Sequence, residues 1–267
     1  MTGCAVITGG GGLLGTALAR AFARQGLDVV LADIDEDRMQ RAIQAVEQEG
    51  RSALAVVTDV AQPEALERLA QEAWGRFERV ERLCLNAGVA VLKPFTELTR
   101  TDWDNVMNVQ WGGVLNGVLA FLPRLVDQEG DRHILIVSSM SGVGRADLRQ
   151  LNAPYVAAKF ACVGLAEVMA PSLEPYGIGV SVLCPGLTVE DPAAMKGTAW
   201  PMASAAWYDE NLLDADEVAD QVTAGISEKR LHIFPHHAGR QEVLDRHARL
   251  MLGFDQAERR RSTRDGG

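Results

Sequence analysis

The sequence has few cysteines, no excess of positive charge and no long apolar run, and each absence excludes a class of protein. Only four cysteines occur in 267 residues, none in C-x-x-C spacing, which argues against a disulfide framework or a zinc cluster. The formal net charge is −10 without any basic stripe, so neither nucleic acid nor an anionic membrane is an expected partner. No uninterrupted apolar segment could span a bilayer, and Met1-Thr-Gly leads directly into a strand-like run, so we expect no signal peptide.

What remains is the composition of a soluble globular protein, with 47% hydrophobic and 23% charged residues. We interpret the cysteines as reduced core residues, which favours a cytoplasmic location; they are Cys4, Cys84, Cys162 and Cys184. The histidines near the C-terminus lack metal-ligand spacing, so we predict no metal site.

Short apolar runs alternate with helical patterns along the whole chain. Strands are predicted at 4–8, 28–33, 53–58, 82–85, 133–138, 179–184 and 231–234, and helices at 14–25, 36–49, 63–77, 101–127, 155–173 and 215–228. This alternation predicts an α/β fold, a doubly wound parallel seven-stranded sheet with helices on both faces. We expect one domain over residues 1–255, followed by a disordered polar tail at 256–267.

The first strand, Cys4-Ala-Val-Ile-Thr8, runs into the turn Gly9-Gly10-Gly11-Gly12-Leu13-Leu14-Gly15 and then a helix. A strand, a glycine turn and a helix bring backbone N–H groups and the positive helix end to one point, which suits a pyrophosphate. Glycine turns also occur without any ligand, because glycine adopts positive φ freely. The position between strand and helix favours the binding site.

Asp33 ends the second predicted strand, eighteen residues beyond Gly15. A carboxylate there can accept hydrogen bonds from adenosine ribose hydroxyls and would repel a 2′-phosphate. Because Ile34 rather than a basic residue follows, the pattern favours NAD over NADP. The alternative is that Asp33 only caps the helix at 36–49.

The pair Tyr155 and Lys159 has i, i+4 spacing in an alanine-rich apolar segment, so both side chains share one helix face. A cation beside a phenol stabilises the phenolate, as a group that exchanges protons requires. Such a pair also arises by chance. Motifs elsewhere in the chain support a functional role for this pair. Ligands bind at the carboxyl ends of parallel strands, where this chain carries Asp59-Val60, Asn86-Ala87-Gly88, Ser138-Ser139 and Pro185-Gly186.

These pieces together resemble the short-chain dehydrogenase/reductase family, from residue 3 to about 250. The matching motifs are Thr8-Gly9 with the glycine turn, Asp59-Val60, Asn86-Ala87-Gly88, Ser138-Ser139-Met-Ser-Gly142, Tyr155-x-x-x-Lys159 and Pro185-Gly186. In this order and spacing they are highly specific.

The resemblance implies a Rossmann fold and an NAD(P)-dependent enzyme that interconverts a secondary alcohol and a ketone. Tyr155 would exchange a proton with the substrate oxygen, Lys159 would assist it and hold the nicotinamide ribose, and Ser139 would polarise that oxygen. Hydride would pass directly between cofactor and substrate. The implied cofactor-binding residues are Gly9, Gly12, Leu13, Leu14, Gly15, Asp33, Ile34, Asp59, Val60, Asn86, Ala87, Gly88, Tyr155, Lys159, Pro185, Gly186 and Thr188.

Three features depart from the family pattern. Leu13 occupies a usual glycine position of compact members, and Gly12 fits the spacing of extended members instead. Gln110 stands where the family has an active-site Asn that helps to hold a proton-relay water, so we expect an altered relay. Ser139 precedes Tyr155 by sixteen residues, about three more than usual, which lengthens the loop at 142–154.

Residues 187–213 are predicted to form a substrate lid. Its large side chains favour a bulky hydrophobic or aromatic substrate, although they would equally suit packing on the body or on a neighbouring subunit; they are Met195, Trp200, Met202, Trp207 and Tyr208. Apolar residues outside the lid are predicted to line the same pocket: Val89, Val91, Met140, Val143, Leu148 and Leu151. In the longer loop, Arg145 and Arg149 could bind a substrate carboxylate, although solvated arginines are the commoner state. Family members assemble as dimers or tetramers through helices that correspond to 101–127 and 155–173.

Two other functions remain open at this point. The glycine spacing also fits a nucleotide-sugar epimerase or dehydratase, but 267 residues leave little room for the larger substrate domain of those enzymes. Leu13 and Gln110 would also suit a non-catalytic NAD-binding regulatory protein, against which the intact Ser139, Tyr155 and Lys159 argue.

Overall fold

The computed structural model describes residues 3–144, 146, 151–192, 212–237 and 239–265. Its centre is a seven-stranded sheet in the order β3-β2-β1-β4-β5-β6-β9 with every neighbouring pair parallel. The strands are β1 (Gly3–Thr8), β2 (Asp28–Asp33), β3 (Ala53–Val57), β4 (Arg79–Leu85), β5 (Arg132–Val137), β6 (Ile178–Leu183) and β9 (His232–Ile233). The predicted doubly wound sheet is confirmed.

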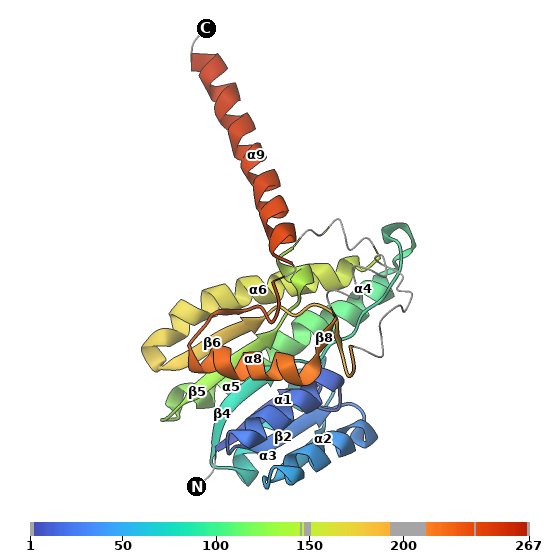
Figure 1. Ribbon diagram of the computed structural model, residues 1–267, viewed down its shortest axis with the longest axis vertical. Helices are drawn as coiled ribbons and strands as arrows, with labels where there is room; N and C mark the ends of the chain where they lie inside the picture. The colour runs from blue at the N-terminus through green and yellow to red at the C-terminus, as the bar shows by residue number, and fades with distance from the viewer. Residues whose placement is uncertain (1–2, 145, 147–150, 193–211, 238, 266–267) are drawn as a thin grey trace.

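Helices cover both faces of the sheet, as Figure 1 shows. Because successive strand residues point to opposite faces, Ala5 and Ile7 pack with one helix layer while Cys4 and Val6 pack with the other. The first layer contains α1 (Leu13–Arg24), α2 (Glu36–Gln48) and α8 (Ala215–Ser227). The second contains α3 (Pro63–Arg76), α5 (Gly113–Asp127) and α6 (Ala153–Leu173).

The segment Ala153–Tyr176, which is α6 with the short turn η5 (Glu174–Tyr176), is long and apolar enough to cross a membrane by length and composition alone. In the fold, α6 instead places Cys162, Ala166 and Met169 in the hydrophobic core against the sheet. Its apolar character is therefore that of a core helix.

The predicted single helix at 101–127 is interrupted. It consists of α4 (Arg100–Met107), a π-helical turn η2 (Asn108–Gly112) and α5. Gly112 and Gly113 have low helix propensity, and a Cβ at Gly113 would lie 2.7 Å from Val60 Cγ2. Close packing of α5 onto the loop after β3 therefore accompanies the irregular turn.

Two short strands, β7 (Thr188–Val189) and β8 (Leu213–Asp214), form a separate parallel pair that the sequence did not predict. They hold the two ends of the predicted lid side by side. The lid residues Met195, Trp200, Met202, Trp207 and Tyr208, together with Leu148, Arg145 and Arg149, lie outside the described residues.

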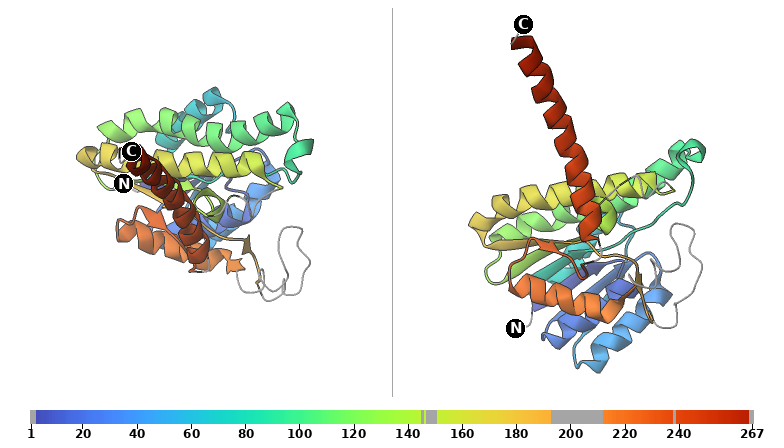
Figure 2. Two further views of the ribbon diagram at one scale, coloured as in Figure 1. Left: turned by 90° about the horizontal axis from the view of Figure 1, so that it is seen from above. Right: turned by 45° about the horizontal axis from the view of Figure 1, so that its top comes forward.

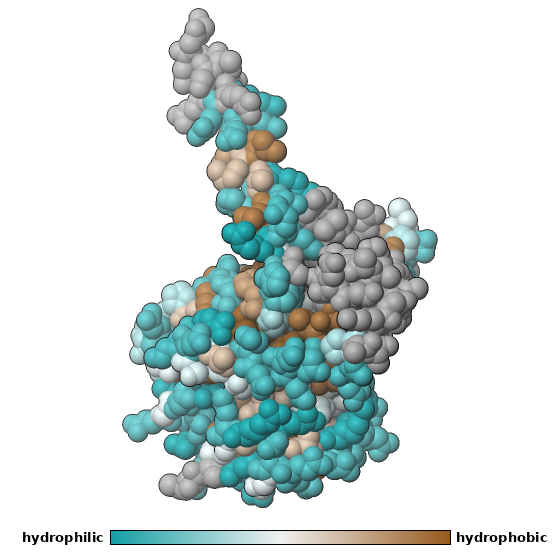
Figure 3. Space-filling view, in the orientation of Figure 1, coloured by the Kyte–Doolittle hydropathy of each residue, from teal (hydrophilic) through white to brown (hydrophobic). Residues whose placement is uncertain are grey.

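The chain ends in the long helix α9 (Arg240–Asp265), which projects away from the body (Figure 2). The predicted disordered tail at 256–267 is therefore wrong as far as Asp265, because Gln256-Ala257-Glu258 and the arginines that follow are good helix formers and no glycine interrupts them before Gly266. Near its base, Arg246 lies 4.8 Å from the Phe160 ring of α6. Further along, Leu250 and Phe254 are 51% and 67% exposed, and apolar surface is visible there in Figure 3.

Candidate active site

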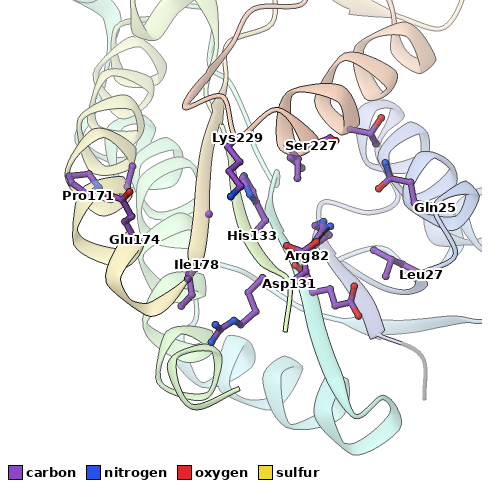
Figure 4. Close-up of a pocket in the computed structure, with 17 residues that line it drawn as sticks. Gln25, Leu27, Arg82, Asp131, His133, Pro171, Glu174, Ile178, Ser227 and Lys229 are labelled. Carbon is purple, nitrogen blue, oxygen red and sulfur yellow. Dashed lines mark hydrogen bonds and ion pairs between the residues drawn. The ribbon is translucent and has the colours of Figure 1, made fainter. Parts of the chain in front are cut away.

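Two cavities in the described part of the chain are candidates for the functional site. The larger, of about 860 Å³, opens where β5 and β6 begin, at Arg132, His133 and Ile178 (Figure 4). Arg82 forms an ion pair with Asp131 there, and Arg132 donates to the Leu125 and Tyr176 carbonyls. Burial lowers the pKa of His133 to about 4, so its imidazole is neutral.

The second cavity, of about 570 Å³, lies at the opposite edge, where parallel strands end. This is the edge at which doubly wound sheets bind ligands, so we take it as the candidate active site. It brings together all the predicted cofactor-binding residues and Gln110; they are Gly9, Gly12, Leu13, Leu14, Gly15, Asp33, Ile34, Asp59, Val60, Asn86, Ala87, Gly88, Tyr155, Lys159, Pro185, Gly186 and Thr188.

The glycine turn is held in a shape that other residues could not adopt. Gly9 has φ +65°, and a Cβ there would lie 2.8 Å from Ala87 Cα, while a Cβ at Gly15 would lie 2.2 Å from the Gly9 carbonyl oxygen. Gly12 provides the N-cap of α1 without a side-chain hydrogen bond, and no acidic residue lies in the first turn. The positive end of α1 therefore faces the cavity without a side-chain cap, as an anion site requires.

Asp33 lies beside this turn and is only 9% exposed. Its Oδ2 accepts a hydrogen bond from the Gly11 amide at 3.0 Å, which joins β2 to the turn. The alternative role as a helix cap belongs to Asp35 instead, since Asp35 accepts from the Arg38 amide at the start of α2. The Oδ1 of Asp33 accepts from the Asp35 amide at 3.3 Å, and each carboxylate oxygen keeps a further lone pair for a ligand in the cavity that Asp33 lines.

Arg38 also lines the cavity, and the sequence analysis did not identify it. It lies in the first turn of α2, and a Cβ at Gly11 would meet the Arg38 Cβ at 2.8 Å. The available signal was its position five residues after Asp33, on a helix that starts at the cavity edge. Other lining residues that were missed are Thr58, Ala90, Val109 and Val137, whereas Val89, which was predicted to line the pocket, and Ser138 of the Ser138-Ser139 motif do line the cavity.

Asn86 connects β4 to the glycine turn. Its Nδ2 donates to the carbonyls of Thr8 and Gly9 at 2.9 and 3.2 Å, and its backbone amide donates to Thr8 Oγ1 at 2.9 Å. These bonds fix the turn relative to β4, so part of the predicted cofactor role of Asn86 is to shape the site.

The predicted pair Tyr155 and Lys159 lies on one face of α6. The Lys159 Nζ is 5.3 Å from the centroid of the Tyr155 ring, and the lysine is only 3% exposed. Its ammonium donates to the Val137 carbonyl at 2.7 Å, at the end of β5. Ser138 Oγ donates to the Lys159 carbonyl at 2.9 Å, so a second bond joins this helix turn to the same strand end. A buried cation is thereby held beside a phenol.

Ser139 occupies the next position after Ser138 and is not among the residues that line the cavity. Its Oγ accepts a hydrogen bond from the Ser141 amide at 3.1 Å and caps the short turn η3 (Met140–Gly142). Because a hydroxyl that accepts one bond retains its own proton, Ser139 can still donate to a ligand.

Gln110 lies in the π-helical turn and is 1% exposed. Its Nε2 donates to the Val89 carbonyl at 2.6 Å, whereas its Oε1 is buried without a hydrogen-bond partner among the residues that the structure describes. The Gln110 backbone carbonyl accepts from the Cys162 thiol, with 3.6 Å between sulfur and oxygen.

An anion site at a helix start and a phenol–ammonium pair along one strand edge define a dinucleotide-dependent oxidoreductase with a Rossmann fold. A family model described as short chain dehydrogenase matches residues 3–200. The chain belongs to the short-chain dehydrogenase/reductase family, whose members bind nicotinamide cofactors.

Individual relatives are similar over most of their length. The C alpha-dehydrogenase of Sphingobium sp. is 32% identical over 93% of this chain and 85% of the relative. The 1-deoxy-11-beta-hydroxypentalenate dehydrogenase of Streptomyces exfoliatus is 32% identical over 91% and 86%. Among solved structures, a Burkholderia phymatum short-chain dehydrogenase/reductase in complex with NAD has a TM-score of 0.82, 31% identity and coverage of 94% and 95%. An alcohol dehydrogenase of Thermococcus sibiricus complexed with 5-hydroxy-NADP has a TM-score of 0.71, 26% identity and coverage of 88% and 96%.

Proposed function

We propose that this oxidoreductase interconverts a secondary alcohol and a ketone with NAD as its cofactor. The observation that carries the proposal is the buried Lys159 ammonium beside the Tyr155 ring, in the same cavity as the glycine turn. The residues fit a dinucleotide, because Gly9 and Gly15 let the turn fold tightly against Ala87 and the start of α1, whose positive end carries no side-chain cap. The names of both relatives describe dehydrogenases, which agrees with this reaction type.

In the proposed mechanism the cofactor supplies hydride chemistry, and the chain supplies proton transfer and alignment. Tyr155 gives its phenolic proton to the carbonyl oxygen during reduction and takes the hydroxyl proton during oxidation. Lys159, fixed by Val137 and buried, stabilises the phenolate through its charge. From its match to the family motif we infer that Ser139, which lies just outside the cavity lining and retains its hydroxyl proton, donates to the substrate oxygen and orients it for Tyr155.

We infer a preference for NAD over NADP from Asp33. Its carboxylate lines the cavity beside the glycine turn, where it would accept from ribose hydroxyls and repel a 2′-phosphate. Arg38 on the same side of the cavity would favour a 2′-phosphate, so Asp33 and Arg38 set the preference in opposite directions.

We also propose that the substrate is bulky and hydrophobic or aromatic. Val89 lines the cavity with 43% of its surface exposed, and Ala90 and Val109 add further apolar surface. Tyr155 and Lys159 supply polar groups in the same cavity, and a few polar groups beside apolar surface are typical of pockets that orient an apolar ligand.

We propose self-association as a dimer or tetramer through α5 and α6, in the cytoplasm. Leu119 and Val168, on these two helices, are 63% and 66% exposed although both are large and apolar. Such residues on neighbouring long helices favour an interface between copies of the chain, which sedimentation equilibrium would detect.

The four buried thiols agree with a reducing compartment.

The reaction is tested by Tyr155→Phe, with Tyr176→Phe as its control because Tyr176 is 52% exposed in η5 and does not line the cavity. NADH and NADPH binding are measured by fluorescence titration, and turnover with a panel of aryl and alicyclic ketones. We expect Tyr155→Phe to lower turnover about 10²–10⁴-fold, since it removes the proton donor, and to leave NADH affinity nearly unchanged. Turnover that survives in Tyr155→Phe would contradict the assigned proton donor. Wild-type protein that binds NADH but converts no ketone would favour the non-catalytic alternative.

A further inference from the structure

The helix α9 is seated on the body at its start and uncovered along the rest of its length. In its first turn Val243 packs against the hydrophobic core, and one turn later Arg246 lies 4.8 Å from the Phe160 ring of α6. Every described side chain from His247 onward is exposed. The body therefore fixes where α9 begins, and the helix then projects away from it (Figure 2).

The side of α9 that packs on the core continues outward as an apolar stripe. Val243, Leu250 and Phe254 are spaced by seven and four residues, which places them on one side of a helix. Met251 lies beside this line, and apolar surface is visible on α9 in Figure 3. Leu250, Met251 and Phe254 are all exposed, and we call these three residues the α9 stripe.

The α9 stripe calls for a second molecule. Isolated helices are marginally stable in water, because most helical stability in proteins comes from packing of an apolar face. Within one copy, none of the described elements covers the α9 stripe, since the helix projects away from all of them. A partner that covers the stripe would supply the missing packing.

The place from which α9 rises favours a second copy of this chain as that partner. Phe160, which Arg246 contacts, and Val168 are eight residues apart and therefore lie on the same side of α6. Val168 is exposed there, and it belongs to the surface through which we propose self-association. Figure 1 and Figure 2 both show α9 rising beside α6. A copy seated on this side of α6 would therefore have α9 next to it.

The distribution of charge favours the same partner. The whole chain has a net charge of −10, whereas α9 carries seven arginines and five carboxylates and so has a net charge of +2. The rest of the chain therefore holds −12. Opposite net charges favour the approach of α9 to the body of another copy, and like charges disfavour two α9 helices lying side by side.

We propose that α9 is an arm that holds a second copy of this chain, with the α9 stripe packed on the body of that copy. Closed pairs of identical chains use the same surfaces on both copies, so each copy holds the other. This inference rests on the proposed self-association and not on the proposed reaction.

Sedimentation equilibrium of the full-length protein tests the arm with single substitutions. Leu250→Asp and Phe254→Asp each place a carboxylate in the α9 stripe. Leu252→Asp is the matched control, because Leu252 is also exposed but lies two residues from each of them, on the opposite side of the helix. Leu119→Asp alters the outer surface of α5 and separates the two parts of the interface.

We expect Leu250→Asp and Phe254→Asp to raise the dissociation constant of the self-associated state about tenfold or more, because each would bury a carboxylate against the partner. Leu252→Asp should match the wild type. If Leu250→Asp also matches the wild type, the inference is overturned while self-association through α5 and α6 stands. Equal losses in Leu250→Asp and Leu252→Asp would overturn it as well, since the effect would then not belong to the stripe.

Photochemical cross-linking identifies what the stripe touches. A benzophenone amino acid replaces Met251, and isotope-labelled and unlabelled chains are mixed before irradiation. We expect cross-linked peptides that join a labelled to an unlabelled chain, with the second site outside α9. Links within one chain only, or between two α9 helices only, would overturn the inference.

The proposed reaction fails or stands separately from the arm. Wild-type protein that self-associates through the α9 stripe but converts no ketone would contradict the reaction and leave the inference in place. A wild type that stays monomeric would overturn the arm together with the proposed self-association, and turnover by that monomer would still support the reaction.

Discussion

Asp33 and Arg38 lie on the same side of the cavity with opposite charges, and their balance determines what the adenosine end of the site accepts. Asp33 is 9% exposed and bonded to Gly11, so its position is fixed, whereas Arg38 is exposed on the first turn of α2. A fixed carboxylate excludes a phosphate more effectively than a solvated guanidinium attracts it, which is the physical reason to expect NAD.

Asp33→Ala should shift the ratio of NADPH to NADH affinity toward NADPH by about tenfold or more, because the repulsion disappears while Arg38 remains. The double variant Asp33→Ala/Arg38→Ala should lose most of this gain. Fluorescence titration with both cofactors measures the ratio, with Asp35→Ala as the control, since Asp35 caps α2 without lining the cavity. If Asp33→Ala leaves the ratio unchanged, Asp33 does not discriminate between the cofactors.

Among single residues, the sequence predicted those whose place in the site depends on residues close to them in the chain. Tyr155 and Lys159 meet because helical spacing brings them together, and Gly9 and Gly15 meet within one turn. Arg38 was missed although it follows Asp33 by only five residues, because its approach to the cavity depends on the packing of α2 on the glycine turn. The hydrogen bond from the Gln110 side chain could not be predicted either, because its acceptor is the Val89 carbonyl, twenty-one residues earlier in the chain.

At the scale of elements, α5 approaches the sheet closely enough to set the position of the β4 end. A Cβ at Gly117 would lie 2.3 Å from Leu85 Cδ2, and Leu85 immediately precedes Asn86, whose bonds hold the glycine turn. The strands and most helices were predictable because their apolar periods match the sheet and its two layers. The break at Asn108–Gly112 was not, since a π-helical turn leaves the apolar pattern of a helix nearly intact.

Gly117→Ala should lower stability by about 1–3 kcal/mol, because the added methyl group overlaps Leu85 in a packed core. Gly75→Ala in α3 is the matched control: its Cβ would meet nothing within 4 Å, so it should stabilise by at most about 0.4–1 kcal/mol. Thermal and urea unfolding measure both changes. Equal effects of the two substitutions would show that α5 moves away from Leu85 without penalty.

At the scale of the whole molecule, one parallel sheet separates two cavities of different character. The larger cavity, at the amino ends, contains an ion pair and a neutral buried imidazole, whereas the smaller one contains the uncapped end of α1 and an unpaired acceptor. Strand direction, and not size, is therefore the ground on which we choose the smaller cavity as the candidate active site. The sequence predicted this edge because the ends of the predicted strands could be located along the chain. It did not predict the long α9, because the polar composition of that segment resembles that of a disordered tail.

The rate at which the four buried cysteines react can report how often the sheet opens. All four are 0% exposed; three lie in β1, β4 and α6 and Cys184 directly follows β6, and burial raises the pKa of Cys4, Cys84 and Cys184 to about 12. Since only an accessible thiolate reacts with a disulfide reagent, we expect labelling of the native protein to wait for the sheet to open. Saturating NADH should slow labelling of all four thiols by one common factor, which reports cofactor affinity without a known substrate. A thiol that reacted early and ignored NADH would reveal a part of the sheet that opens independently of the cofactor site.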